Sequence, residues 1–164
     1  WDGWMNDQQI ISVLHHYPAL KAIADHYAVL LTIENIVTNE NDPLYYCRML
    51  CSQNPDVSFT YDTKMAAFHC QEDALCAPEN AAVSSRIRHL HINDYGGGYK
   101  EWPKFKTLHI GDGHVDFHSL FKYLPSIHYD DDFTTEATSF DSTGRIDINK
   151  LNCTLATLKK YTQE

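Results

Sequence analysis

Long apolar runs, paired-cysteine motifs and an excess of positive charge are all absent from this 164-residue sequence. No stretch approaches the roughly 20 apolar residues of a membrane-spanning helix, so we expect no membrane partner. The 22 acidic residues outnumber the 13 basic ones and give a formal net charge of −9. Proteins that bind the nucleic-acid backbone need a basic face, so we also expect no nucleic-acid partner.

Cysteine occurs in an odd number, five, and no two cysteines form a Cys-x-x-Cys pair. We therefore expect reduced thiols, as is typical of cytoplasmic proteins, and no zinc–thiolate site. The opening residues Trp1-Asp2-Gly3-Trp4 are polar and lack a basic segment, so we expect no signal peptide. The chain also lacks an initiator methionine, which suggests that further residues precede Trp1.

Helix-like and strand-like segments alternate along the whole chain. Apolar residues recur at helical spacing in the first segment, and Asp42, Asp116 and Asp147 are placed to cap later helices. We expect five helices, over about 7–27, 43–52, 71–84, 116–124 and from 147 onward. Strands are expected over about 29–36, 57–63, 86–93 and 132–138. This order predicts a single α/β domain over residues 1–164 with parallel strands.

Each expected strand has one acidic or imidazole side chain near its C-terminal end: Glu34, Asp62, His91 and Glu136. Side chains alternate between the two faces of a strand, and these four all fall on the polar face. Three carboxylates and an imidazole suit Mn²⁺, Mg²⁺, Co²⁺ or Zn²⁺, and burying them without a cation would be costly. The pattern therefore predicts one divalent metal ion at the strand ends, as in (β/α) barrels.

Some assignments stay open on the sequence alone. His89 shares the polar face with His91, one step earlier in the strand, and is an alternative ligand. Asn93 and Asp94 either shape the following loop or bind the metal. The turn at residues 111–113 leads towards a helix N-terminus, which is an alternative site for a phosphate.

Five segments in order resemble the sugar-phosphate isomerase/epimerase family. This family belongs to the xylose isomerase-like TIM barrel superfamily, which includes the ketose 3-epimerases and endonuclease IV. The resemblance covers the chain from about residue 20 to its end and is carried by residues 31–35, 61–63, 89–94, 109–117 and 134–136. The four strand-end residues are separated by 28 (34 to 62), 29 (62 to 91) and 45 residues (91 to 136).

The resemblance implies that Glu34, Asp62, His91 and Glu136 are the metal ligands on strands five to eight of a TIM (β/α)8 barrel. It also implies that Glu34 and Glu136 are catalytic and handle protons, through an enediolate, in a sugar or sugar phosphate. Which glutamate acts as the base stays open. Lys64, His69 and His109 are polar candidates for binding the carbohydrate substrate.

The sequence departs from the family pattern at three places. Met65 stands where the family often has a histidine, and glycines at 96–98 stand where the epimerases have an arginine. Phe105 and Thr107 replace an Asp-x-His pair of endonuclease IV, so we do not expect a DNA endonuclease. A metal-dependent dehydratase of a polyol ketone and a non-catalytic sugar-binding barrel remain alternatives to an isomerase.

The chain is expected to supply only half of that barrel. A full barrel takes about 250 residues, and the four expected strands match the C-terminal half. Open sheet edges invite association. We therefore expect either a missing N-terminal half-barrel or a homo-oligomer.

Overall fold

The computed structural model describes residues 6–162. The opening residues Trp1 to Trp4, on which the expectation of no signal peptide rests, lie outside the described residues. Four parallel strands form one sheet in the order β1-β2-β3-β4, within residues 6–162. These strands are β1 (Thr32–Glu34), β2 (Ser58–Asp62), β3 (Ile87–His91) and β4 (Phe133–Thr134). All four lie inside the ranges expected from the sequence, so the predicted α/β class with parallel strands is confirmed.

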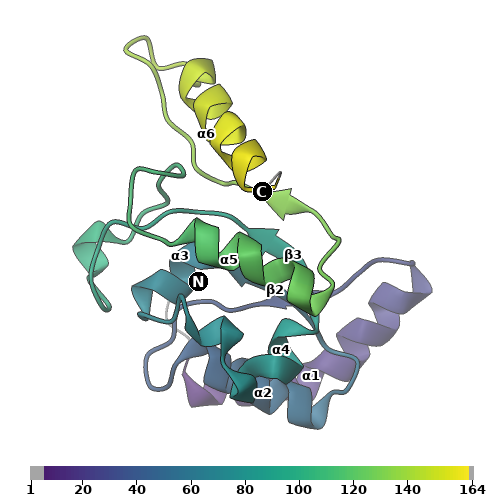
Figure 1. The fold of residues 1–164 in the computed structure, drawn as a ribbon. Helices are drawn as coiled ribbons and strands as arrows, with labels where there is room; N and C mark the ends of the chain where they lie inside the picture. Colours follow the sequence, from purple (N-terminus) through teal and green to yellow (C-terminus); the bar gives the residue numbers. More distant parts are fainter. Residues whose placement is uncertain (1–5, 163–164) are drawn as a thin grey trace.

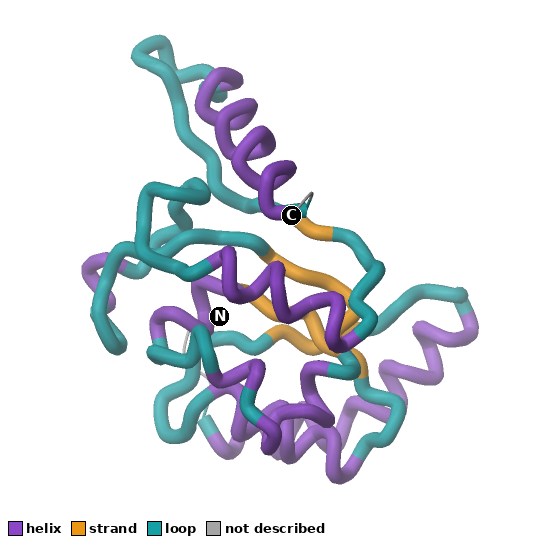
Figure 2. Tube along the Cα trace, viewed as in Figure 1, coloured by secondary structure: helices purple, strands orange, loops and turns teal. Residues whose placement is uncertain are grey.

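Helices connect the strands and follow the last one (Figure 1). Over the described range they are α1 (Asp7–His26), α2 (Pro43–Gln53), α3 (Thr63–Phe68), α4 (Ala81–Ser84), α5 (Phe117–Tyr123) and α6 (Ile148–Tyr161). Four short 3-10 helices, Ala74–Cys76, Pro78–Asn80, Trp102–Lys104 and Leu124–Ile127, lie in the connections. Figure 2 shows that long loops join these short elements.

The expected caps are confirmed. The carboxylate of Asp42 accepts a hydrogen bond from Tyr45 N, that of Asp116 from Ser119 N, and that of Asp147 from Lys150 N. Such bonds satisfy backbone donors that have no partner within the helix. Pro18 lies inside the first helix, which continues from Asp7 to His26.

The expected number of five helices is wrong, because α3 follows β2 without a break. Asp62, the last residue of β2, is also the N-cap of α3, and its Oδ1 accepts from Lys64 N and Met65 N. The strand pattern and the helix start therefore share residues, and no turn signal separates them in the sequence. Both the sheet and the start of α3 therefore fix the position of Asp62.

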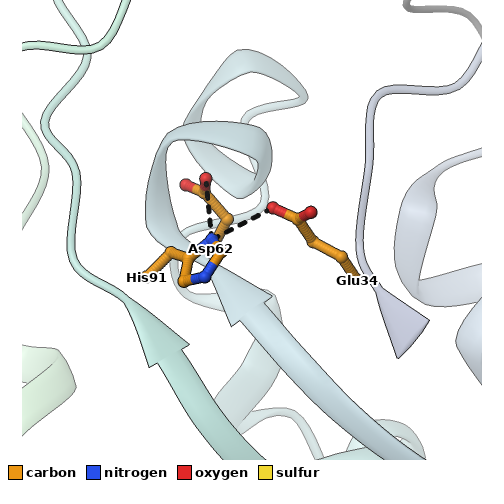
Figure 3. A group of neighbouring side chains, drawn as sticks. All are labelled: Glu34, Asp62 and His91. Atoms are coloured by element: carbon orange, nitrogen blue, oxygen red, sulfur yellow. Dashed lines mark ion pairs between the residues drawn. The ribbon is translucent and has the colours of Figure 1, made fainter. Parts of the chain in front are cut away.

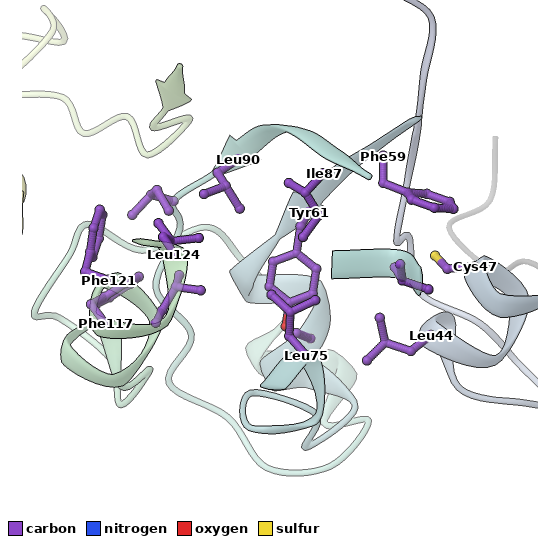
Figure 4. Close-up of a cluster of buried hydrophobic side chains, with 14 of the residues drawn as sticks. Leu44, Cys47, Phe59, Tyr61, Leu75, Ile87, Leu90, Phe117, Phe121 and Leu124 are labelled. Atoms are coloured by element: carbon purple, nitrogen blue, oxygen red, sulfur yellow. The ribbon is translucent and has the colours of Figure 1, made fainter. Parts of the chain in front are cut away.

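The apolar face of the sheet forms the core (Figure 4). Phe59 and Tyr61 of β2 and Leu90 of β3 pack against side chains of the covering helices. Those helical side chains are Tyr17 from α1, Leu44, Cys47 and Leu50 from α2, Val83 from α4, and Phe117, Leu120 and Phe121 from α5. Burying a side chain of this size contributes about 1.5–3 kcal/mol. The helices therefore fix the sheet from one side only.

The opposite face of the sheet is polar and open. Thr32 and Thr60 share a hydrogen bond of 2.8 Å between their hydroxyl oxygens, and His89 Nε2 lies 2.9 Å from Thr134 Oγ1. These residues belong to the face that the alternation pattern predicts to be polar. A hollow of about 590 Å³ lies over this face, with Thr32, Glu34, Thr60, His89 and His91 among its lining residues.

The last helix, α6, stands apart from the covering helices in Figure 1. Near its C-terminal end the Tyr161 ring stacks on Phe121 with centroids 5.6 Å apart, and in its middle the buried Thr154 contacts His109. The part of the chain from 6 to 162 contains no helix that is long and apolar enough to cross a membrane.

Candidate metal centre

Three strand ends bring Glu34, Asp62 and His91 together (Figure 3). One ligand atom from each residue lies within 4.8 Å of the others. The sheet register explains this proximity, because Asp62 pairs with His91 and Glu34 pairs with Thr60, two residues before Asp62. The longer side chain of Glu34 spans that offset. Together with Glu136, these residues are called the strand-end cluster below.

The imidazole nitrogen His91 Nδ1 lies at the centre of the strand-end cluster. It is 3.3 Å from Glu34 Oε1, 3.9 Å from Asp62 Oδ2 and 3.7 Å from Glu136 Oε2. The atom is buried and has no hydrogen-bond partner among the described residues. A buried polar atom without a partner costs free energy, and a cation bound between Nδ1 and the carboxylates would remove that cost.

Glu136 reaches the cluster from the loop after β4, two residues beyond its last residue. Its side chain is 44% exposed, whereas that of Asp62 is fully buried. The Asn93 amide nitrogen donates to Glu136 Oε2 at 2.9 Å and to Asp62 Oδ2 at 3.1 Å. Asn93 Oδ1 also accepts from Glu136 N at 2.9 Å. One amide therefore joins two carboxylates and fixes the backbone of Glu136.

A second amide, that of Asn35, holds the backbone of Asp62. Asn35 Oδ1 accepts from Asp62 N at 2.6 Å, and Asn35 Nδ2 donates to Asp62 O at 3.1 Å. Both asparagines are buried. Sequence reasoning missed Asn35 and left Asn93 open, although each follows a predicted ligand by one or two residues, which was the available signal.

Burial raises the pKa of the Asp62 carboxyl group to about 6. The Lys64 ammonium group opposes this rise, and the Glu34 carboxylate adds to it, because like charges disfavour the ionised form. A bound divalent cation would favour the ionised form. Oxygen donors with one imidazole are the ligands that Mn²⁺, Mg²⁺, Co²⁺ and Zn²⁺ accept. The donor set, the unpaired Nδ1 and the carboxylates that face it therefore fit one such ion.

His91, rather than His89, belongs to this cluster. The His89 ring stands at 89° to that of His91, with centroids 5.2 Å apart, and its Nε2 is occupied by Thr134. Asp94 does not join the cluster either. Its buried carboxylate accepts from Tyr95 N, Gly111 N, Gly113 N and Val115 N, and so shapes the loop.

The three expected substrate contacts lie in different places. Lys64 lines a second hollow, of about 480 Å³, that also contains two members of the strand-end cluster. The residues around this Lys64 hollow are Glu34, Ile36, Lys64, Met65, Thr107 and Glu136. His69 is not among these lining residues of the described chain. Its Nε2 accepts from Thr38 N at 3.2 Å, so it supports the loop after β1.

His109 has both ring nitrogens occupied outside the strand-end cluster. Nδ1 lies 2.8 Å from Thr154 Oγ1, and Nε2 lies 3.1 Å from Ser139 Oγ. Thr154 belongs to α6 and is buried. His109 therefore attaches the last helix and the preceding loop to the body, while the sequence predicted it as a substrate contact.

Neither a scan against protein-family models nor a search of curated proteins gives a match for this chain.

Proposed function

We propose that this protein is a divalent-metal-dependent isomerase or epimerase of a sugar or sugar phosphate. One observation carries the proposal: Glu34 and Glu136 lie within 3.3 and 3.7 Å of His91 Nδ1, and both line the Lys64 hollow. Two carboxylates beside a cation site and an open volume suit proton transfer to and from a carbon. The five motifs that resemble the sugar-phosphate isomerase/epimerase family support the same reaction class.

The residues of the strand-end cluster have separate roles in this proposal. Asp62 and His91 would hold the ion together with the two glutamates. Asn93 orients the carboxylates of Asp62 and Glu136, and Asn35 holds the backbone of Asp62. A divalent ion supplies Lewis acidity that polarises neighbouring carbonyl and hydroxyl oxygens of the substrate. One of Glu34 and Glu136 removes a proton from the carbon between those oxygens, and the other returns a proton. The enediolate is the species between these two proton transfers.

We also propose that the sheet is half of a TIM barrel. The polar face carries the ligands at the C-terminal ends of the strands, which is where such barrels place active sites. The edges of β1 and β4 are unpaired within the described chain. Four further strands, from upstream residues or from a second copy, would pair with both edges and enclose the hollows. Light scattering of the 164-residue chain tests whether a second copy supplies these strands, because a dimer would have twice the 18.9 kDa mass of one chain.

Metal binding and solvent exchange test the proposed function. Calorimetric titration with Mn²⁺ is expected to give one site per chain, and the loaded protein is expected to exchange solvent deuterium into a carbon-bound position of D-fructose or D-fructose 6-phosphate. Glu136→Gln should abolish the exchange, because the amide cannot accept the proton. Glu101→Gln is the control, since Glu101 pairs with Lys104 outside the cluster.

The outcomes separate the alternatives. Loss of hydroxide from the sugar instead of exchange would identify a dehydratase. Tight sugar binding without exchange would indicate a non-catalytic sugar-binding protein. Absence of Mn²⁺, Co²⁺, Zn²⁺ and Mg²⁺ binding would refute the metal site itself.

A further inference from the structure

Lys64 is largely buried, and its ammonium group has no carboxylate partner within residues 6–162. The residue as a whole is only 8% exposed. Its Nζ donates to Thr107 Oγ1 at 3.0 Å and lies 5.0 Å from the centroid of the Phe105 ring. Within residues 6–162 it makes no ion pair. A neutral hydroxyl and a ring are therefore the contacts of this positive charge.

The simplest role of Lys64 would be to neutralise the strand-end cluster. The positions of the side chains argue against this as its sole role. Lys64 is two residues from Asp62, yet its Nζ pairs with none of the cluster carboxylates and is held instead by Thr107, on the long loop after β3. A lysine that served as a counter-ion alone would gain most from a direct ion pair, because attraction weakens with distance.

Lys64 faces the same volume as the proposed acid–base groups. The Lys64 hollow has Glu34 and Glu136 on its lining together with Lys64 and Thr107. A molecule whose oxygens approach the metal site would extend its remaining atoms into this hollow. The ammonium group has three N–H donors, and Thr107 accepts from one of them.

An anionic oxygen satisfies this ammonium group better than a hydroxyl oxygen. A carboxylate or phosphate oxygen adds charge–charge attraction to its hydrogen bond with the ammonium group, and a hydroxyl oxygen lacks that attraction. A ligand that fills the hollow would also remove water from the ammonium group, and a paired negative charge offsets the cost of that desolvation. A neutral sugar would leave that requirement unmet.

We propose that Lys64 selects a substrate with an anionic group, a carboxylate or a phosphate, by binding one of its oxygens in the Lys64 hollow. This inference rests on the proposed isomerase or epimerase function and narrows its substrate class. The substrate is then a sugar acid or a sugar phosphate, and Lys64 is the residue that distinguishes it from a neutral sugar.

Binding of three probes to the Mn²⁺-loaded protein tests the inference. The probes are D-fructose, D-fructose 6-phosphate and D-fructuronate, which carry no charge, a phosphate and a carboxylate. Isothermal titration is expected to show that one anionic probe binds about tenfold or more tightly than D-fructose. The probe that gains affinity distinguishes a phosphate from a carboxylate. Equal affinity for all three probes, or no binding of any probe, would overturn the inference.

Variants test whether Lys64 causes the higher affinity for the anionic probe. Lys64→Met, loaded with Mn²⁺ to saturation, should bind the anionic probe and D-fructose with nearly equal affinity, so that the ratio of the two affinities measures the preference. Lys64→Gln gives the same comparison if the methionine variant does not fold, as judged by circular dichroism. Lys106→Met, which removes an exposed lysine next to Thr107 in the loop after β3, should keep the preference. A preference that survives in Lys64→Met or Lys64→Gln would refute the role of Lys64.

The failure of this inference is distinguishable from that of the proposed function. A wild-type protein that takes up Mn²⁺ and exchanges deuterium into D-fructose without favouring an anionic probe refutes only the inference. A protein that binds no divalent ion refutes the proposed function and the inference with it.

Discussion

The side-chain amide of Asn93 holds Glu136 at two points, by accepting from its backbone N–H and donating to its carboxylate, at 2.9 Å each. The same amide nitrogen donates to Asp62 Oδ2. β4 ends before Glu136, so the sheet itself does not fix this glutamate. Asn93 therefore positions a proposed ligand that lies outside regular structure.

Asn93→Ala is expected to lower Mn²⁺ affinity by about 10- to 100-fold, which is typical when a group that orients metal ligands is lost. The carboxylates of Glu136 and Asp62 would lose their shared donor. Titration calorimetry measures the change. Asn152→Ala, in an exposed position of α6, should bind Mn²⁺ like the wild type. Equal affinities of the Asn93 variant and the wild type would contradict this role.

His91→Gln is expected to remove the stabilisation by Mn²⁺, whereas His89→Gln should retain it. A ligand that binds only the folded state, at a hundred times its dissociation constant, stabilises that state by about 2.7 kcal/mol. Thermal unfolding with Mn²⁺ and with EDTA measures this difference. The opposite result would make His89 the ligand, an alternative that the sequence leaves open.

Asp94→Asn is expected to destabilise the fold by about 3 kcal/mol, because hydrogen bonds to a buried charged group are strong and unpaired buried donors are costly. The Asp94 carboxylate accepts from four backbone N–H groups, and an amide would direct donors at some of them. Urea unfolding measures the loss. Asp112→Asn breaks only an exposed ion pair with Lys150, so its cost should be about 1 kcal/mol or less. Similar losses for the two variants would contradict the structural role of Asp94.

Gly113→Ala is expected to disrupt the same loop. A Cβ atom at Gly113 would lie 2.3 Å from Tyr95 O and 2.4 Å from Asp94 Oδ1, closer than real contacts allow. We expect a loss of about 1–3 kcal/mol, as for other overpacked sites. At Gly98 the nearest atom to a Cβ is Glu101 Oε2 at 3.7 Å, so Gly98→Ala is the matched control for the urea measurement. A stable Gly113→Ala protein would mean that the loop relaxes freely.

His69 is expected to make stability fall in mild acid. Burial, aided by the Lys100 charge, lowers the pKa of His69 to about 4 from its usual 6.5. Between these pH values the unfolded chain therefore binds more protons than the folded protein. The contribution of His69 to stability is fully present above pH 6.5 and is lost as the pH falls towards 4. The expected loss from pH 7.5 to 5 is about 2 kcal/mol. Urea unfolding of wild type and His69→Gln at both pH values measures it, and an identical pH dependence of the two proteins would contradict it.

Local sequence patterns predicted most of the fold. The four strands lie inside their expected ranges because apolar and polar side chains alternate along them, and helices begin at Asp42, Asp116 and Asp147 because those carboxylates cap free N–H groups. Helix α3 was missed because its cap, Asp62, is also a strand residue. The alternating pattern assigned Asp62 to a strand, and it gave no sign that the same residue also caps a helix.

Sequence patterns describe one element at a time, and this also explains how the predicted site differs from the observed one. Alternation along the strands identified Glu34, Asp62 and His91 as one polar set, because their residue types and face are properties of each strand alone. Their separation of a few ångströms depends on the register between strands, which hydrogen bonds across the sheet decide. His109 shows the converse, since its contacts to Thr154 and Ser139 join segments 45 and 30 residues away.

The sequence by itself determined the composition of the strand-end cluster and the face on which it lies. Tertiary structure alone decided that His91 Nδ1 points at three carboxylates, that Asn93 joins two of them, and that Lys64 turns to Thr107 rather than to Asp62. The physical reason is that periodicity is set by backbone geometry within one element, whereas distances and hydrogen-bond partners depend on how separate elements pack.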